Sequence, residues 1–241
     1  IRSMKLHGGA FGTRGGYRPT KDELEKEDID AVLRGAQGNL DRHIKNMAGF
    51  GMPVIVSINR FYSDTDAELD ALKMAAQKSG ASHVALTEVH ANGGKGGEEL
   101  AKAVVAAVHD HVAKGRPFTP LFTPETPVLE KMNSIATRIY KAEGVEISTP
   151  AMKQLAKLQA WGYGHLPVCM AKTQYSFSHD PGKLGAPVGF TIPVREFRLN
   201  AGAGFIVAIL GNMMTMPGLP KRPAALDMDM DEEGRLTGVF G

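Results

Sequence analysis

Two consecutive strand–loop–helix units constrain the fold of this chain more than any other feature. Apolar runs at residues 53–58 and 83–87 are each typical of a buried parallel strand, and amphipathic helices are predicted after them at residues 66–78 and 97–113. Because right-handed crossovers bring parallel strands into one sheet, both loops are expected at the same carboxyl edge. Open α/β sheets bind their ligands at that edge.

The predicted helices have defined inner faces. In the helix at 97–113, the positions expected to face inward are Leu100, Val104, Val108 and Val112. Residues 21–50 carry apolar side chains every three or four positions, which predicts one long helix bent at Gly35 and Gly38. Residues 7–19 lack periodicity and are predicted to be a loop after an opening strand.

Prolines concentrated in residues 115–127 mark a boundary. Beyond it the pattern predicts helices ending near residues 142 and 160, and strands at 190–195 and 205–209. The predicted fold class is α/β: part of a parallel sheet with flanking helices at residues 1–116, followed by a smaller α+β domain at residues 117–241. An acidic surface strand and turn are predicted at residues 227–235.

Composition argues against several classes of function. The 28 basic and 26 acidic residues are interspersed and give a net charge of +2, so no general attraction for nucleic acid is expected. No apolar stretch approaches the roughly 20 residues that cross a bilayer, so no membrane span is expected. The single cysteine, Cys169, lies in an apolar run, which predicts a buried thiol in a reducing, cytoplasmic compartment.

The loop after the first strand contains Asn59, Phe61 and Asp64. Their order is similar to the guanine-specificity loop of P-loop GTPases, but the spacing between the Asn and the Asp is too long for that motif, and the chain has no G-x-x-x-x-G-K-[ST] motif. Phe61 is either a stacking platform for a flat heterocycle or a core aromatic beneath the next helix. The sequence leaves both readings open.

The loop after the second strand combines His90 with a glycine-rich run at residues 93–97. Backbone N–H groups around Gly94, with Lys95 as a point charge, could bind an anion, although such turns also occur without a ligand. Together with Asn59 and Asp64, these two residues are candidates for an anion or nucleotide edge. No metal site is predicted at His90, because no Cys or second His lies at ligand spacing.

Two further groups of polar residues are less specific. His7 and His43 read as surface or helix residues. The polar run at residues 172–178 follows a predicted buried strand, and is either the edge of a site or a capped turn. No residue is assigned a catalytic role.

Six motifs in colinear order closely resemble formate–tetrahydrofolate ligase, also called 10-formyltetrahydrofolate synthetase. They occupy residues 5–9, 58–65, 93–97, 167–176, 194–207 and 214–221. The resemblance implies ATP-dependent ligation of formate to tetrahydrofolate, with Mg²⁺ accompanying the nucleotide, a monovalent cation as activator and a tetrameric, cytoplasmic enzyme. It also implies a P-loop-NTPase-like fold, in which residues 1–116 belong to the nucleotide and folate domain.

The resemblance covers only the carboxyl-terminal part of that enzyme. The chain begins at Ile1 without an initiator Met, and the family's P-loop and phosphate-binding lysine belong to an amino-terminal half that this sequence lacks. Isolated, the chain is not expected to catalyse the reaction.

In the resembling family a Phe and a Trp hold the pterin ring between them. The Phe matches Phe61, but the Trp position is His90, and a Pro that usually follows the Phe is Tyr62. Leu86 matches an apolar residue at the floor of the pocket. An imidazole has a smaller face than an indole and can gain a proton near neutral pH, so folate binding is expected to be weaker and pH-dependent.

Two alternatives belong to other classes. The chain could be a non-catalytic α/β module that keeps a heterocycle pocket without phosphate chemistry, or a structural subunit that supports oligomerisation. A G-x-x-x-x-G-K-T motif upstream of Ile1 would favour the enzyme.

Overall fold

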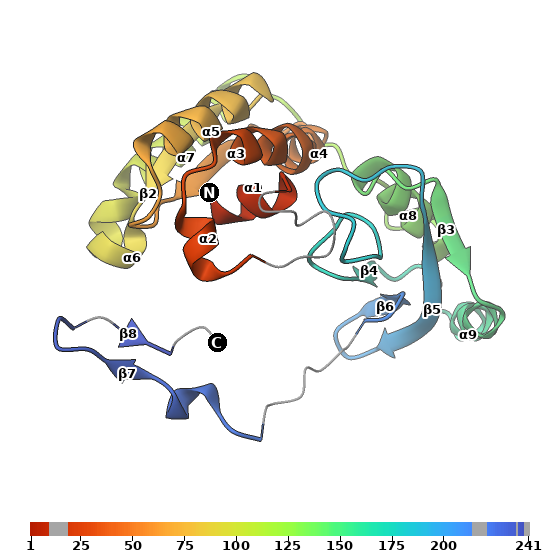
Figure 1. Ribbon diagram of the computed structural model, residues 1–241. Helices are drawn as coiled ribbons and strands as arrows, with labels where there is room; N and C mark the ends of the chain where they lie inside the picture. The colour runs from red at the N-terminus through yellow and green to blue at the C-terminus, as the bar shows by residue number, and fades with distance from the viewer. Residues whose placement is uncertain (10–18, 214–220, 235, 239–241) are drawn as a thin grey trace. The chain divides into compact units, whose positions relative to one another are not determined.

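A computed structural model describes residues 1–9, 19–213, 221–234 and 236–238 of the chain (Figure 1). By backbone contacts the chain divides into two units, Ile1–Gly211 and Asn212–Gly241. Most of the predicted loop at residues 7–19 and most of the motif at 214–221 lie outside the described residues.

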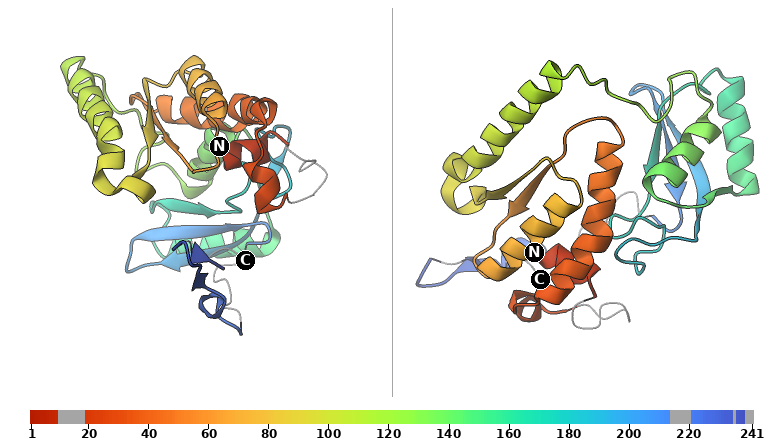
Figure 2. Two further views of the ribbon diagram at one scale, coloured as in Figure 1. Left: turned by 60° about the vertical axis from the view of Figure 1, so that its left-hand side comes forward. Right: turned by 90° about the horizontal axis from the view of Figure 1, so that it is seen from above.

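The first half of the large unit is built on two parallel strands. Its elements are α1 (Arg2–His7), α2 (Lys21–Glu25), α3 (Ile29–Gly35), the π-helical η2 (Ala36–Leu40), α4 (Asp41–Ala48), β1 (Ile55–Asn59), α5 (Asp66–Lys78), β2 (His83–Thr87), α6 (Val89–Asn92), the 3-10 helix η3 (Gly93–Gly97) and α7 (Glu98–Ala113). Ile55 pairs with His83 and Asn59 with Thr87, in parallel. Helices α5 and α7 lie on either side of these strands (Figure 2).

Apolar side chains from α3, α4, α5 and both strands form the first core, which includes Val32, Ile44, Ile58, Leu69, Leu72 and Val84. The predicted helix at 66–78 and the predicted strand at 83–87 are confirmed. The first strand, predicted within the apolar run at 53–58, occupies residues 55–59 and so ends one residue later than that run. A local signal explains why the start of α5 was predicted correctly, because Thr65 and Glu68 form a capping box there.

A buried ion pair connects four helices of this half. Lys5 and Glu68 are 1% and 0% exposed, and the Lys5 Nζ lies 2.7 Å from Glu68 Oε1. The ammonium also donates to the carbonyls of Leu24 (2.9 Å) and Lys26 (2.7 Å), while Glu68 accepts the N–H of Asp28 at 2.8 Å. The pair therefore links α1, the end of α2, the start of α3 and the first turn of α5.

Two helix predictions need correction. The prediction of an opening strand is wrong, because residues 2–7 form the helix α1. A short apolar run in a sequence is compatible with either a strand or a helix. The single helix at 21–50 is wrong in its first part, since the chain leaves the helix after Glu25 and restarts at Ile29, where Asp28 caps the Ala31 N–H. The bend predicted at Gly38 is a π-helical turn.

The inner face predicted for α7 is wrong at three of its four positions, and the fourth, Leu100, is partly buried. Val104, Val108 and Val112 are 43%, 53% and 72% exposed, and the buried residue of α7 is Ala103. The apolar pattern is real, but nothing in the described part of the chain buries these three valines.

The second half of the large unit is a four-stranded mixed sheet with helices. Its elements are α8 (Val128–Ser134), the π-helical η4 (Ile135–Ile139), β3 (Gly144–Ile147), α9 (Thr149–Ala160), β4 (Val168–Ala171), β5 (Thr191–Asn200) and β6 (Phe205–Leu210). The strand order is β3-β5-β6-β4; β5 and β6 are antiparallel with an irregularity between Val194 and Glu196, and the outer pairs are parallel. The predicted strands at 190–195 and 205–209 are confirmed.

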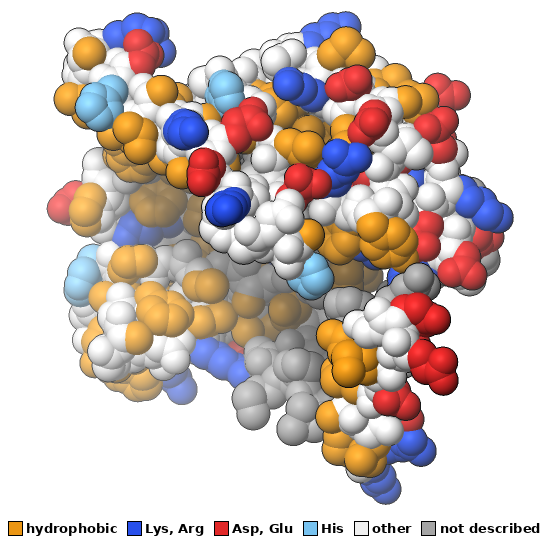
Figure 3. Space-filling view, turned by 90° about the vertical axis from the view of Figure 1, so that its left-hand side faces the viewer, with side chains coloured by type: hydrophobic (Ala, Val, Ile, Leu, Met, Phe, Trp, Pro, Cys, Tyr) orange, Lys and Arg blue, Asp and Glu red, His pale blue; other side chains and the backbone are white. Residues whose placement is uncertain are grey.

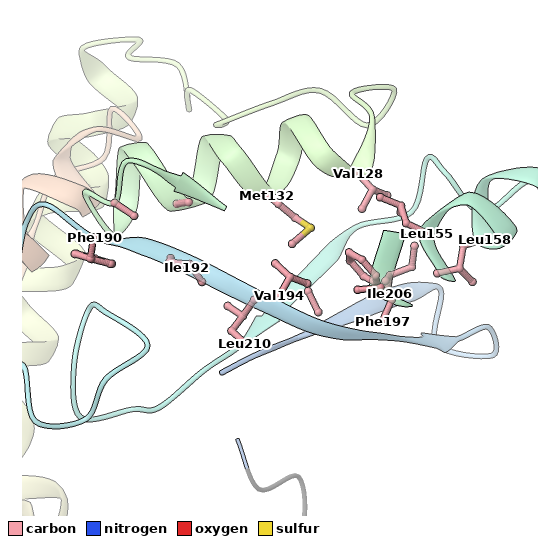
Figure 4. Packing of buried hydrophobic residues seen from close by; sticks show 14 residues of the cluster. Val128, Met132, Leu155, Leu158, Phe190, Ile192, Val194, Phe197, Ile206 and Leu210 are labelled. Carbon is pink, nitrogen blue, oxygen red and sulfur yellow. The ribbon is translucent and has the colours of Figure 1, made fainter. Parts of the chain in front are cut away.

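A second core packs on this sheet, and Figure 4 shows how Met132 and Leu155 converge on Val194 and Ile206. The residues of the first core all precede the predicted boundary at 116 and 117, and those of the second core all follow it. The division into domains at that boundary stays a prediction. Cys169 is exposed, so the predicted burial of its thiol is wrong: it occupies an outward position on β4.

Side chains of the first half of the large unit donate hydrogen bonds to main-chain carbonyls of the second half. Arg42 donates to the carbonyls of Pro187 (2.6 Å) and Ala186 (3.2 Å), and Asn46 donates to that of Ile139 (2.9 Å). These side-chain to main-chain hydrogen bonds connect the two cores of the large unit.

The small unit contains η5 (Ala224–Leu226) and an antiparallel pair, β7 (Asp229–Met230) and β8 (Leu236–Thr237), which agrees with the predicted acidic strand and turn as far as residues 227–234 are described. Basic and acidic side chains are interspersed on the face shown in Figure 3. Within the described residues, the helices are all too short or too polar to cross a bilayer.

Candidate functional site

The two loops predicted to form a site start from the same edge of the β1–β2 sheet. The Arg60 N–H donates to the Thr87 carbonyl at 2.9 Å, which extends the strand pairing by one residue. The Arg60 guanidinium lies 3.0 Å from Asp66 and 3.9 Å from Glu88, so this side chain of the first loop contacts the start of α5 and the start of the second loop. The polypeptide therefore carries Phe61 and His90 away from adjacent strand ends.

The first loop presents Phe61 through a buried carboxylate. Asp64 is 5% exposed, and its Oδ2 accepts the Phe61 N–H at 2.9 Å. Phe61 itself is 41% exposed, and the Arg2 guanidinium carbon lies 3.9 Å from the centroid of its ring. Of the two readings left open for Phe61, the exposed fraction favours a ring that is accessible at the surface, with Arg2 on one face.

Tyr62 has a different contact. Its side chain is 81% exposed, and its hydroxyl donates to Glu25 Oε1 at 2.7 Å. The hydrogen bond to the Glu25 carboxylate raises the pKa of Tyr62. Tyr62 thus connects the loop to α2.

The backbone conformation of the second loop requires glycine at two positions. Gly93 has φ +56°, which side chains rarely tolerate, and a Cβ on Gly96 would lie 2.5 Å from the backbone of Glu88. Gly94 has open space around it, and Lys95 and His90 are exposed. Backbone geometry thus accounts for Gly93 and Gly96, whereas Gly94 and Lys95 remain accessible to a ligand.

Leu86 and Asn59 lie on the strands themselves. Leu86 is partly buried and lines a cavity of about 330 Å³ together with Ile58, Leu69 and Val84. Phe61, Tyr62 and His90 do not line that cavity, so Leu86 is not in the same cavity as the proposed stacking residues. Asn59, the last residue of β1, is exposed.

The described residues contain no group of three His, Cys, Asp or Glu side chains that could hold a metal ion. The buried Asp64 carboxylate is engaged by the loop backbone, which leaves Asn59, Gly94 and Lys95 as the exposed members of the predicted nucleotide edge.

One cluster was not predicted as a site. His7 and His43, expected at the surface, line a common cavity with Lys172, which belongs to the polar run at 172–178. That run was the available signal in the sequence, but nothing in it indicated the two histidines, which are more than 100 positions away.

Comparisons with known proteins agree with one another. Residues 1–240 match the protein family described as formate–tetrahydrofolate ligase. A curated relative of that name from Paracoccus denitrificans (strain Pd 1222) is 49% identical over 240 residues, which make up 100% of this chain and 40% of the relative. Relatives of the same name from Leuconostoc citreum (strain KM20) and Symbiobacterium thermophilum are 47% and 46% identical. The chain spans about 40% of the length of these relatives.

Proposed function

Because the chain belongs to the formate–tetrahydrofolate ligase family, we propose that it serves the ATP-dependent ligation of formate to tetrahydrofolate, which yields 10-formyltetrahydrofolate, ADP and phosphate. Its contribution in this proposal is the pterin-binding part of the enzyme. We place the chain in the carboxyl-terminal part of the family's sequence, and we do not expect it to catalyse the reaction without a P-loop.

One observation supports the proposal above the others: Phe61 is an exposed aromatic ring held at the same sheet edge as the loop that carries His90. The exposed part of this aromatic ring is accessible for stacking on a flat ligand. The Asp64–Phe61 hydrogen bond fixes the loop before a ligand arrives, which reduces the entropy lost on binding.

In this reading Phe61 stacks on one face of the pterin and His90 on the other. The Arg2 guanidinium occupies one face of the Phe61 ring, so the pterin would take the opposite face. Tyr62 contributes through its contact with Glu25, which holds the loop against α2. Leu86 would support the pocket from the strand below rather than contact the ring directly.

The nucleotide side of the reaction is proposed on the family resemblance. Gly94 and Lys95, with Asn59 and the Asp64 loop, would form the edge nearest the phosphates, and Mg²⁺ would accompany ATP. A monovalent cation, a tetrameric assembly and a cytoplasmic location belong to the same proposal. So do a fold of P-loop-NTPase type and a division into a nucleotide and folate domain (1–116) and an α+β domain (117–241).

The test is a calorimetric titration of the chain with tetrahydrofolate. Loss of one aromatic stacking partner costs about 1–3 kcal/mol, so Phe61→Ala is expected to raise the Kd about 5- to 150-fold. Trp161→Ala is the matched control, because Trp161 is also an exposed aromatic (65%) but lies at the end of α9. Equal affinity of Phe61→Ala and the unmodified chain would refute the assignment of Phe61.

The non-catalytic alternative makes a separate prediction. A heterocycle-binding module would bind tetrahydrofolate but would support no formate-dependent release of phosphate from ATP when combined with the P-loop half of a relative. Binding without restored turnover would favour the module.

A further inference from the structure

A second cavity, distinct from the proposed pterin site, lies at the interface between the two cores of the large unit. It has a volume of about 450 Å³, which is the size of a small organic ligand. His7 from the end of α1, His43 from α4 and Lys172, directly after β4, line it. Among the described residues that line it, none is an Asp or a Glu.

Lys172 is held by carbonyl groups and has a donor to spare. Its Nζ donates to the carbonyls of Thr173 (2.9 Å) and Ser176, and lies 4.9 Å from the centroid of the Tyr140 ring. An ammonium group has three donors, so two carbonyl bonds leave one N–H available. No carboxylate lies within ion-pair distance of this ammonium in the described residues. Burial lowers the pKa of Lys172 to about 8.

The two histidines add imidazole groups to the lining, and these bring no negative charge. His7 Nδ1 accepts the Gly185 N–H at 3.0 Å, which assigns the proton of the neutral ring to Nε2. Burial and the neighbouring His43 lower the pKa of His7, which is consistent with a neutral ring. Burial, followed by Arg42 and Lys172, lowers the pKa of His43, so positive charge is already concentrated around it.

Aromatic side chains complete the lining. Phe50, Tyr140 and Phe177 all contribute, and the His43 ring lies 4.6 Å from that of Phe177, centroid to centroid. A cavity that combines aromatic surface with basic groups and lacks acids is complementary to an anion with an apolar body.

We propose that this cavity binds an organic oxyanion, in which a carboxylate or phosphoryl group contacts Lys172 and His43 and an apolar or aromatic body packs against Phe177 and Tyr140. The proposal does not depend on the pterin site, because it uses other residues and a different cavity.

The test uses the 241-residue chain and two probes, sodium benzoate and inorganic phosphate, at constant ionic strength. Saturable binding of either probe by calorimetry is expected, and Lys172→Gln is expected to weaken it about 10- to 100-fold through loss of a charge-assisted hydrogen bond. Lys153→Gln is the matched control, because Lys153 is an exposed lysine of α9. Benzoate binding alone would identify a carboxylate on an aromatic body, and phosphate binding alone a phosphoryl group.

A second measurement covers the possibility that Lys172→Gln fails to fold. In the unmodified chain the NMR signals of the His43 imidazole should shift saturably with the probe, while those of the exposed His109 on α7 should not. Affinity should also fall as pH rises through about 8, where Lys172 loses its proton. The other titratable groups that line the cavity are His7, His43, Tyr140 and Tyr175, and Arg42 acts on His43. The proposal is overturned if neither probe saturates, if Lys172→Gln binds like the unmodified chain, or if the His43 signals do not move.

Discussion

Removing one member of the buried Lys5–Glu68 pair should destabilise the protein strongly. In Lys5→Met, the Glu68 carboxylate stays buried and loses its counter-ion, and the carbonyls of Leu24 and Lys26 lose their donor. Breaking a buried ion pair from one side costs about 3–5 kcal/mol. Because domains are stable by about 5–15 kcal/mol, this is a large part of the total.

Glu68→Gln should cost less, about 1–3 kcal/mol, since the amide oxygen can still accept the Asp28 N–H. The double variant leaves no isolated charge in the site. Its loss of unfolding free energy should therefore be smaller than the sum of the two single losses, by about 1–3 kcal/mol.

The assay is urea unfolding followed by circular dichroism. The free energies of unfolding of the three variants and the unmodified chain are compared with one common m-value, the slope of that free energy against urea concentration. Lys45→Met is the matched control, because Lys45 and Asp41 form an exposed pair at 2.8 Å with the lysine 68% exposed, and such pairs contribute about 0–1 kcal/mol. If Lys5→Met loses less than about 1 kcal/mol, or if the two single losses simply add, the pair does not stabilise these helices as argued.

Two further predictions concern titration and the folate site. Because the pKa of Lys172 is lowered to about 8 in the folded chain, the unfolded state binds more protons between about pH 8 and 10.5, so the free energy of unfolding should rise with pH in that window. The side chain is only partly buried, so the rise should be about 1 kcal/mol after solvent screening, and Lys172→Gln should remove it from pH-dependent urea titrations; a rise of the same size in the variant would contradict this. His90→Trp should tighten tetrahydrofolate binding severalfold by enlarging the stacking face, and calorimetry that shows equal or weaker affinity would count against His90 as the second stacking partner.

Local patterns were sufficient where neighbouring residues determine the structure. The span of α5 follows from the Thr65–Glu68 capping box and an amphipathic repeat, and β2 follows from a short apolar run between polar residues. The place of Phe61 at a strand end also follows from the order of the elements.

Other features depend on residues far apart in the chain. The apolar repeat of α7 identifies its valines but not whether another element covers them. Cys169 sits in an apolar run, yet the strand that carries it exposes this position. The His7, His43 and Lys172 cavity requires the packing of α1, α4 and the segment after β4, which no local pattern specifies.

The Arg42 and Asn46 hydrogen bonds between the two cores use acceptors that every amino acid possesses. Arg42 and Asn46 bind the backbone oxygens of residues 139, 186 and 187, not their side chains. Sequence drift at those three acceptor positions can therefore proceed without loss of these bonds, as long as the path of the main chain is kept. Drift at the two donor positions has no such freedom, so the two sides of one interface are expected to evolve at unequal rates.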